Sequence, residues 1–479
     1  MVRGYCLPSA LDNGQQRAPG VIRLLTSRTD WDSDKTYKQM VILINFSDVK
    51  FATANPNPRE HYDSLFNVRG YEERRGAGSV ADYFREQSGG HFNLSFDVYG
   101  PVEVSSKARQ DGATKNTRNY GVSALREAAT IVVNDNPDVD YSVYDWNGDQ
   151  YIDQVIYVYA GYGGNQGSED SYGHIWPNTY SFTQLRIGDT PYYISEYTCS
   201  AERWVVSNGK YRSCGIGTIC HEFSHCLGLP DLYDTSSGNP VMDEWTLMDG
   251  GNFTNMGSCP PNYTPLEKKL LGWIDYEELT EPAYISDLEP GKVYQIKTST
   301  DNDYYLLENR QQTGWDNAAP GKGLLIYHVS YNANSWSGNT VNNGAKHLYD
   351  IIHADGKDYD AWNKIIGDNN NPYDQSSWCN SKILSTSPFP YQDSESETVA
   401  DSFTEVDGKP VTNIKMTDDG LISFSFRSAD APDAIRSHVA DGRTRQLYDL
   451  SGHRVETPQT GHIYIRKLDD GSVRKIICK

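Results

Sequence analysis

The sequence predicts a fold of the α+β class, with a first part that mixes helices and strands and a second part that is rich in β-strands. Three observations lead to this prediction. The chain of 479 residues contains 41 glycines and 22 prolines, which is typical of a protein with many turns. Apolar residues at helical spacing are confined to a few segments before about residue 272. Beyond about residue 280, short apolar runs are separated by Gly, Asn and Asp turns.

The elements of the first part follow from local patterns. Residues 1–35 show little periodicity and are expected to be a linker, a terminal arm or the remnant of a pro-segment. Ser79 can cap a short helix that Gly89 and Gly90 end. Branched apolar runs predict strands, and apolar residues at a period of 3.6 predict helices. The expected elements are strands at 41–46, 92–98 and 155–159, and helices at 80–87, 120–133, 217–227 and 264–271.

The second part contains short strands at 304–308, 323–328 and 422–426, followed by a linker near 428–440. The last ~40 residues are expected to form further short strands around Gly452 and Gly461. The length of the chain fits about two to four domains.

Charge and composition exclude several classes of function. The chain has 43 Lys+Arg against 64 Asp+Glu, a net charge of −21, which argues against nonspecific binding to nucleic acid or to an anionic membrane. No apolar run approaches the ~18 residues of a membrane span. No signal peptide is visible, so the protein is either intracellular or has lost its signal. The acidic, Tyr- and Asn-rich composition favours an exported protein, secreted or at the cell surface. We expect a monomer.

The eight cysteines leave the redox compartment open. Cys199 and Cys214 flank a loop and could pair. Cys220 and Cys226 lie six residues apart on a predicted helix and face different ways, so a bond between them is not expected.

The most informative segment is residues 220–231, which contains H-E-x-x-H followed by Gly and Asp at fixed offsets. His221 and His225 are four residues apart, so both imidazoles leave the same face of a helix. Gly228 can adopt a positive φ and turn the chain back, which lets Asp231 provide a third ligand. Two imidazoles and a carboxylate, with a fourth position open, suit catalytic zinc.

The neighbouring Glu222 is expected to act as general base. Zinc would activate a water and polarise a scissile carbonyl, and Glu222 would take the proton of that water and pass it to the leaving amine. The alternative is an ordinary amphipathic helix with two surface histidines and a glycine C-cap. That alternative does not explain why a third potential ligand follows the turn.

Met248, in the segment 245–250, resembles the methionine turn of metzincin metallopeptidases, in which a Met forms an apolar floor under the metal. Longer segments resemble the immune inhibitor A family of secreted bacterial metallopeptidases. They are residues 78–90, 221–234, 270–273, 307–310 and 323–328, so the resemblance extends over about residues 38–428. At Ser224 and Cys226 that family more often has Gly and Asp, and neither position is a ligand.

The resemblance implies a secreted zinc endopeptidase that acts on proteins or peptides. Its metzincin-like catalytic domain would have a twisted mixed sheet and an active-site helix, with His221, His225 and Asp231 as zinc ligands and Glu222 as base. The expected domains are an arm or pro-segment remnant at 1–35, the catalytic domain at 36–278, a β-rich, sandwich-like domain at 279–428, and a linker with a short β module at 429–479. That tail is similar to C-terminal sorting-type modules of type IX secretion.

A second metal site is predicted in the segment 145–153. Asp145, Asn147, Asp149 and Asp153 offer side-chain oxygens at positions 1, 3, 5 and 9, and Tyr151 offers a backbone carbonyl. This is the start of an EF-hand-type calcium loop, in which Gly148 rather than the sixth residue is expected to form the turn. The loop lacks the glutamate of the twelfth position, and the alternative is a plain Asn/Gly turn.

Three other residues are weaker candidates for a role in the site. Cys6 could place a thiolate on the open zinc position and hold the enzyme latent. His174 could lie on a strand that pairs with substrate, although a place on the rim is the simpler expectation. Tyr263 could stabilise an oxyanion, but no spacing supports this role. His328 and His353 are expected to be structural.

Two further functions remain open. The chain could be a catalytically inactive adhesion or binding module that uses its β-rich part, although an intact Glu222 favours the enzyme. It could also be a metal-dependent hydrolase of a non-peptide bond.

Overall fold

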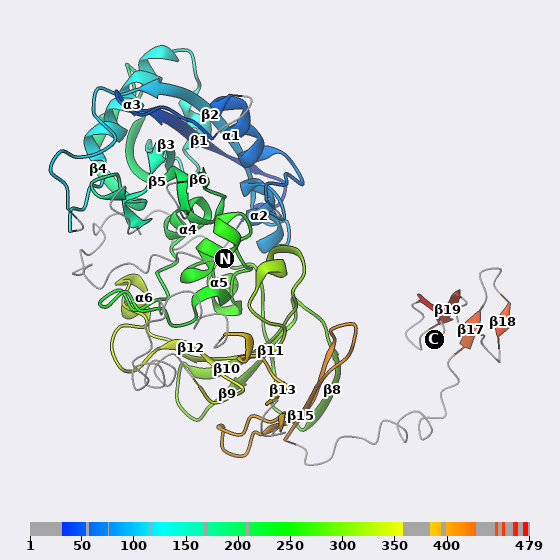
Figure 1. The fold of residues 1–479 in the computed structure, drawn as a ribbon. Helices are drawn as coiled ribbons and strands as arrows, with labels where there is room; N and C mark the ends of the chain where they lie inside the picture. Colours follow the sequence, from blue (N-terminus) through cyan, green and yellow to red (C-terminus); the bar gives the residue numbers. More distant parts are fainter. Residues whose placement is uncertain are drawn as a thin grey trace. The chain divides into compact units, whose positions relative to one another are not determined.

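The computed structural model (Figure 1) describes residues 31–53, 57–74, 76–114, 116–166, 171–206, 210–357, 384–393 and 399–427, and the strand segments 446–448, 453–455, 463–467 and 473–477. The contacts divide the chain into two compact units, residues 1–427 and 428–479. Within the described residues, no helix combines the length and the apolar character needed to cross a membrane.

The first part of the larger unit is built on a mixed sheet. Its strands are β1 (Thr36–Asn45), β2 (Asn93–Glu103), β3 (Val155–Tyr162), β4 (Asn178–Arg186), β5 (Tyr193–Val206) and β6 (Lys210–Ser213). The order is β2-β1-β3-β5-β4, and β6 pairs with β5. The neighbours from β2 to β5 are parallel, whereas β4 runs antiparallel to β5 at one end of the order.

Helices cover both faces of this sheet. Alternate residues of β1 point to opposite faces, so Val41 and Leu43 belong to one apolar cluster while Ile42 and Ile44 belong to another. Helices α1 (Pro58–Asn67), α2 (Val80–Gln87) and α4 (Gly217–Cys226) contribute to the first cluster, and α3 (Val122–Asp135) contributes to the second. Burial on both faces explains the continuous apolar run of β1.

Further β-sheets make up the second part, beyond the short helix α5 (Pro265–Leu270). A five-stranded sheet has the order β12-β11-β10-β9-β7, and a three-stranded sheet has the order β15-β16-β8. The bounds are β7 (Glu277–Glu278), β8 (Ala283–Leu288), β9 (Val293–Lys297), β10 (Asp303–Arg310), β11 (Gly323–Ser330), β12 (Tyr349–Ile352), β15 (Val411–Met416) and β16 (Ile422–Phe426). Helix α6 (Ala333–Ser337) follows β11, and β13 (Tyr391–Gln392) pairs with β14 (Val399–Ala400).

The five-stranded sheet is buried on both faces. Leu306 of β10 belongs to the apolar cluster that includes α4, whereas Leu307 belongs to a cluster shared with β16. Leu325 and Ile326 of β11 divide in the same way. One face of this sheet therefore packs on the first part of the unit, and the other packs on the three-stranded sheet.

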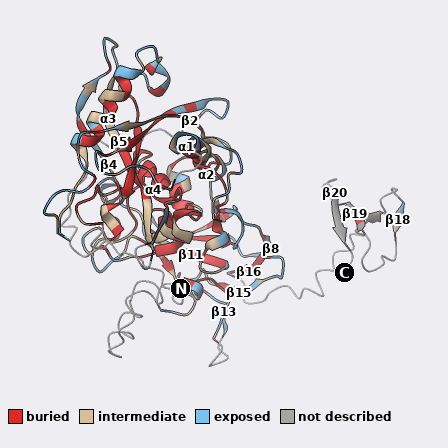
Figure 2. Cartoon of the chain, turned by 45° about the horizontal axis from the view of Figure 1, so that its top comes forward, coloured by how far each residue is buried: buried red, intermediate tan, exposed pale blue. Residues whose placement is uncertain are grey.

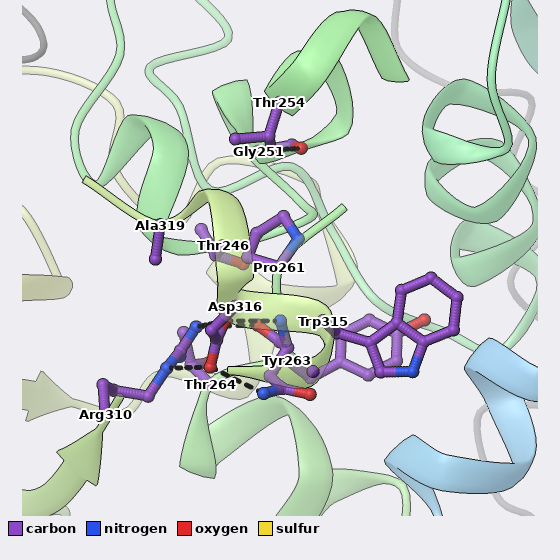
Figure 3. Close-up of polar contacts among 12 residues, drawn as sticks. Thr246, Gly251, Thr254, Pro261, Tyr263, Thr264, Arg310, Trp315, Asp316 and Ala319 are labelled. Carbon is purple, nitrogen blue, oxygen red and sulfur yellow. Dashed lines mark hydrogen bonds and ion pairs between the residues drawn. The ribbon is translucent and has the colours of Figure 1, made fainter. Parts of the chain in front are cut away.

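A buried ion pair lies where the two parts meet (Figure 3). The guanidinium of Arg310 on β10 donates to both carboxylate oxygens of Asp316, with a distance of 2.8 Å from Nε to Oδ2. Asp316 also accepts hydrogen bonds from the backbone and side-chain nitrogens of Asn262, at 3.0 and 2.6 Å. The segment before α5 is thus anchored to the β-rich part.

In the unit 428–479, the described strands form a four-stranded antiparallel sheet in the order β18-β17-β19-β20. They are β17 (Gln446–Tyr448), β18 (Arg454–Val455), β19 (Ile463–Lys467) and β20 (Val473–Ile477). Short strands were expected in this tail.

Most predicted elements are present, and the differences have local causes. Ser79 does cap α2, through a capping box with Asp82. The sequence reasoning missed α1, although Asn57 caps it and Pro58 begins it. Trp31, in the segment predicted as an arm, is buried and donates from Nε1 to the carbonyl of Leu271 at 3.0 Å. Residues 1–30 lie outside the described residues.

Cys199 and Cys214, which could pair on sequence grounds, are both free thiols. Cys220 and Cys226 are also free, as expected.

Candidate metal centre

Helix α4 brings the two predicted histidine ligands into the interior of the protein. All ten of its residues are buried, and Figure 2 shows the helix almost wholly in the colour of buried residues. The rings of His221 and His225 leave one face, with centroids 4.8 Å apart. After the helix ends, Gly228 adopts a φ of +94°, which turns the chain back as predicted. Asp231 then returns to the same face.

The three side chains converge on one point. Oδ1 of Asp231 lies 3.2 Å from Nε2 of His221 and 3.2 Å from Nε2 of His225. Among the described residues, these three are the one group of at least three His, Cys, Asp or Glu side chains whose ligand atoms all lie within 4.8 Å of one another. The segment that carries the acidic loop therefore provides no second group of this kind.

Backbone carbonyls set the tautomer of both imidazoles. Nδ1 of His221 lies 2.8 Å from the carbonyl oxygen of Leu247, and Nδ1 of His225 lies 2.7 Å from that of Leu229. A carbonyl oxygen can only accept, so each neutral imidazole carries its hydrogen on Nδ1. Each Nε2 then presents its lone pair to the common point, as a metal ligand must.

This geometry fits a tetrahedral zinc ion. Ligand atoms about 2.0–2.1 Å from such an ion are roughly 3.3–3.4 Å apart. The two separations of 3.2 Å between nitrogen and carboxylate oxygen are close to this edge length. Two neutral imidazoles and one carboxylate form a donor set that zinc accepts, and they leave a fourth position for a small ligand.

The local field favours a cation at this point. Burial lowers the pKa of His221, but the hydrogen bond to Asp231 and the negative charges of Glu222 and Asp231 outweigh it, so the pKa of this imidazole is raised. The same negative charges would stabilise a divalent ion. The site therefore attracts a positive charge even though it is shielded from water.

Glu222 lies next to the first histidine, and a residue of the sheet contacts it. Oγ1 of Thr179, on β4, lies 2.9 Å from the Oε2 of Glu222 and 2.6 Å from its carbonyl oxygen. Thr179 is 6% exposed and Glu222 is 9% exposed, so little water competes for these contacts. Sequence reasoning missed Thr179, because no local motif links it to a residue 43 positions away.

Met248 is fully buried. Its carbonyl oxygen accepts a hydrogen bond from the backbone nitrogen of Leu232, the residue after Asp231, at 2.8 Å. The carbonyl that orients His221 belongs to the preceding residue, Leu247. The segment 247–248 therefore contacts the first predicted ligand and the residue that follows the third.

The acidic loop folds around its own backbone. Oδ1 of Asp145 accepts from the backbone nitrogens of Gly148 and Asp149 at 2.8 and 3.2 Å, and Oδ2 accepts from that of Gln150 at 2.9 Å. The oxygen of Asn147 accepts from Asp149, and Asp153 accepts from Trp146. Gly148 has a φ of +80°, but Gln150 at the sixth position also has a φ of +71°. The positive φ expected at Gly148 is therefore present, and the sixth residue of the loop has one as well.

The weaker candidates have other surroundings. Tyr263 is fully buried and its hydroxyl pairs with the hydroxyl of Ser224, which makes it a core residue rather than an oxyanion donor. His174 precedes β4, is 8% exposed and packs edge-on against Tyr162, so it is not on the strand. Cys6 lies outside the described residues.

The chain matches a known peptidase family and several of its members. The family described as "Immune inhibitor A peptidase M6, catalytic domain" matches residues 26–272, more than half of the chain. Immune inhibitor A from Bacillus thuringiensis subsp. alesti is 26% identical over 303 residues, which cover 51% of this chain and 42% of that protein. The pre-pro-metalloprotease PrtV from Vibrio cholerae serotype O1 (strain M66-2) is 27% identical over 334 residues, which cover 61% of this chain and 34% of that protein. The chain thus matches less than half the length of these relatives.

Proposed function

The chain belongs to the immune inhibitor A family of M6 peptidases, and from this premise we propose that it is a zinc-dependent endopeptidase that hydrolyses peptide bonds of proteins. The observation that carries the proposal is the convergence of His221, His225 and Asp231, in which the carboxylate oxygen lies 3.2 Å from both imidazole nitrogens, with Glu222 next in sequence to His221. The finer assignment of the fold to the metzincins, with Met248 in the methionine turn, is part of this proposal.

His221, His225 and Asp231 would hold the zinc. When bound, the ion would supply Lewis-acid chemistry, polarising the scissile carbonyl and making water more acidic. Glu222 would accept the proton of the attacking water and transfer it to the leaving nitrogen of the substrate. The hydroxyl of Thr179, 2.9 Å from Oε2 of Glu222, would hold the carboxylate so that its other oxygen faces the water.

We expect the substrate to bind in an extended conformation along β4. This strand forms one end of the sheet order, and its residue Thr179 contacts the expected general base. A strand at the end of a sheet can add an extended peptide through backbone hydrogen bonds. This arrangement favours a peptide over an ester or a sugar as the substrate.

The test compares Glu222→Gln with the wild-type chain on a protein substrate such as casein. We expect the variant to keep its zinc and to lose cleavage, because the amide cannot accept a proton. Removal of zinc with a chelator should abolish wild-type cleavage, and added zinc should restore it. If Glu222→Gln cleaved the substrate at the wild-type rate, the role of Glu222 as general base would be refuted. If the wild-type chain bound zinc but cleaved no substrate, the adhesion module would be favoured.

Export of the protein is also proposed. One relative is named a pre-pro-metalloprotease, and the acidic composition of this chain agrees with a secreted or surface location. Residues 36–278 would then act as the catalytic domain and 279–428 as a β-rich domain. The tail at 429–479 would act as a sorting-type module.

Calcium in the loop from Asp145 to Asp153 is proposed as a structural ion. Glu196 of β5 supports it, because burial and the negative charges of Asp153 and Asp149 raise the pKa of its carboxyl to about 8. A calcium ion shared by these carboxylates would offset their mutual repulsion.

A further inference from the structure

The third predicted ligand, Asp231, is held by a residue from the second part of the chain. The side-chain oxygen of Asn339 accepts a hydrogen bond from the backbone nitrogen of Asp231 at 2.6 Å. The side-chain nitrogen of the same amide donates to Oδ2 of Asp231 at 2.7 Å. Asn339 therefore contacts Asp231 twice, across 108 positions of sequence.

The two oxygens of Asp231 consequently have different partners. Oδ2 faces Asn339 at 2.7 Å, and Oδ1 faces the Nε2 atoms of both histidines at 3.2 Å. A carboxylate can rotate about its last bond, so a ligand without such a partner would sample several orientations. The amide of Asn339 holds the orientation in which Oδ1 completes the donor set.

Neighbouring contacts hold the backbone around this pair. Oγ1 of Thr235 donates to the carbonyl oxygen of Asn339 at 2.9 Å, and its backbone nitrogen donates to Oδ1 of Asn343 at 2.8 Å. Asn342 is fully buried and donates to the carbonyl oxygen of Leu232 at 2.7 Å. The loop that carries Asp231 is therefore fastened at several points to the segment 339–343.

An asparagine suits this position for two reasons. Its φ of +56° is in the left-handed region, which Asn and Asp tolerate better than most residues. The position also requires one acceptor for a backbone nitrogen and one donor for a carboxylate, and only a side-chain amide of this length offers both. An aspartate here would keep the acceptor but would place a second carboxylate against Oδ2 of Asp231.

We propose that Asn339 is a positioning residue for the zinc ligand Asp231, so that the β-rich part completes a metal centre whose three ligands lie within residues 26–272. The matched family covers only these residues, and Asn339 lies beyond them. The inference rests on the zinc site of the proposed function but not on peptidase activity. Partners of this kind around metal ligands commonly change metal affinity about 10- to 100-fold when they are replaced.

The test measures zinc affinity by competition with a chromophoric chelator in the full chain, for the wild type, Asn339→Asp and Asn339→Gly. Asn339→Asp is nearly isosteric and reverses the contact with Oδ2 from attraction to repulsion. Asn339→Gly removes both contacts and tolerates the positive φ. We expect zinc to bind about 10- to 100-fold more weakly in both variants. The visible spectrum of the cobalt-substituted variants should also change, because the geometry of the carboxylate ligand changes.

Asn343→Asp is the matched control. It adds the same charge four positions away, and the contacts of Asn343 with Thr235 use only the side-chain oxygen that aspartate retains. Its zinc affinity and cobalt spectrum should stay near those of the wild type.

Wild-type zinc affinity in both Asn339 variants would overturn the inference, as would an equal loss in Asn343→Asp. Loss of the near-ultraviolet circular dichroism of both metal-free Asn339 variants would also overturn it, because the role would then be structural. A wild-type chain that binds no zinc would instead refute the proposed function.

Discussion

Replacement of Thr179 by valine tests how the expected general base is held. Valine has nearly the same shape as threonine but lacks the hydroxyl, so Thr179→Val removes the contact with Glu222 and leaves the packing of β4 in place. A hydrogen bond to a charged group contributes about 1.5–3 kcal/mol. This corresponds to about a 10- to 150-fold loss in kcat if the contact matters only for the chemical step.

The geometry places the expected loss near the lower limit. A hydroxyl has one hydrogen, and Oγ1 of Thr179 faces both Oε2 of Glu222 at 2.9 Å and the carbonyl oxygen of Glu222 at 2.6 Å. The two acceptors compete for that hydrogen, so the carboxylate receives only part of the interaction. We therefore expect kcat to fall about 10-fold, with KM nearly unchanged.

The assay uses a quenched fluorescent peptide at saturating zinc, with zinc content measured for each protein. Thr179→Ser is the control, because it keeps the hydroxyl and should retain most of kcat. A kcat of Thr179→Val within twofold of wild type would refute the reasoning. An equal loss in the serine variant would point to packing rather than to the hydroxyl.

Three other predictions concern stability. Asp316→Ala should lower the free energy of unfolding by about 3–5 kcal/mol in urea titrations, because it leaves the buried Arg310 without its bidentate partner. Replacing both Arg310 and Asp316 by apolar residues should recover most of this loss. A double variant as destabilised as Asp316→Ala would contradict this account. Burial raises the pKa of Glu267 from 4.5 to about 7, so the folded chain holds a proton that the unfolded chain has released, and stability should fall as the pH rises from about 4.5 to about 7. Glu267→Gln should reduce this fall by up to about 3 kcal/mol, and an unchanged pH profile of the melting temperature would refute the assignment. Titration with calcium at constant zinc should raise the melting temperature of the wild type but not of Asp149→Ala, and no rise in the wild type would count against the calcium loop.

Much of the larger unit could be predicted because its signals are local. The continuous, branched apolar run of residues 41–46 indicated β1, and Ser79 as a capping residue indicated the start of α2. Whether Cys199 and Cys214 pair could not be predicted, because the distance between two cysteines depends on how β5 and the segment before α4 pack, and both thiols are free. The positive φ of Gln150 was not predicted, because a non-glycine residue at positive φ has no clear sequence signal.

The sequence by itself determined which side chains share one face of α4 and where the turn at Gly228 returns the chain, since helical period and backbone freedom act over a few residues. Only the tertiary structure decided that Thr179 lies against Glu222 and that Asn339 lies against Asp231. These pairs are 43 and 108 positions apart, and their contact depends on the packing of a sheet edge and of a β-rich part against one helix. Such packing is the sum of many apolar contacts between distant segments, and no short motif encodes it.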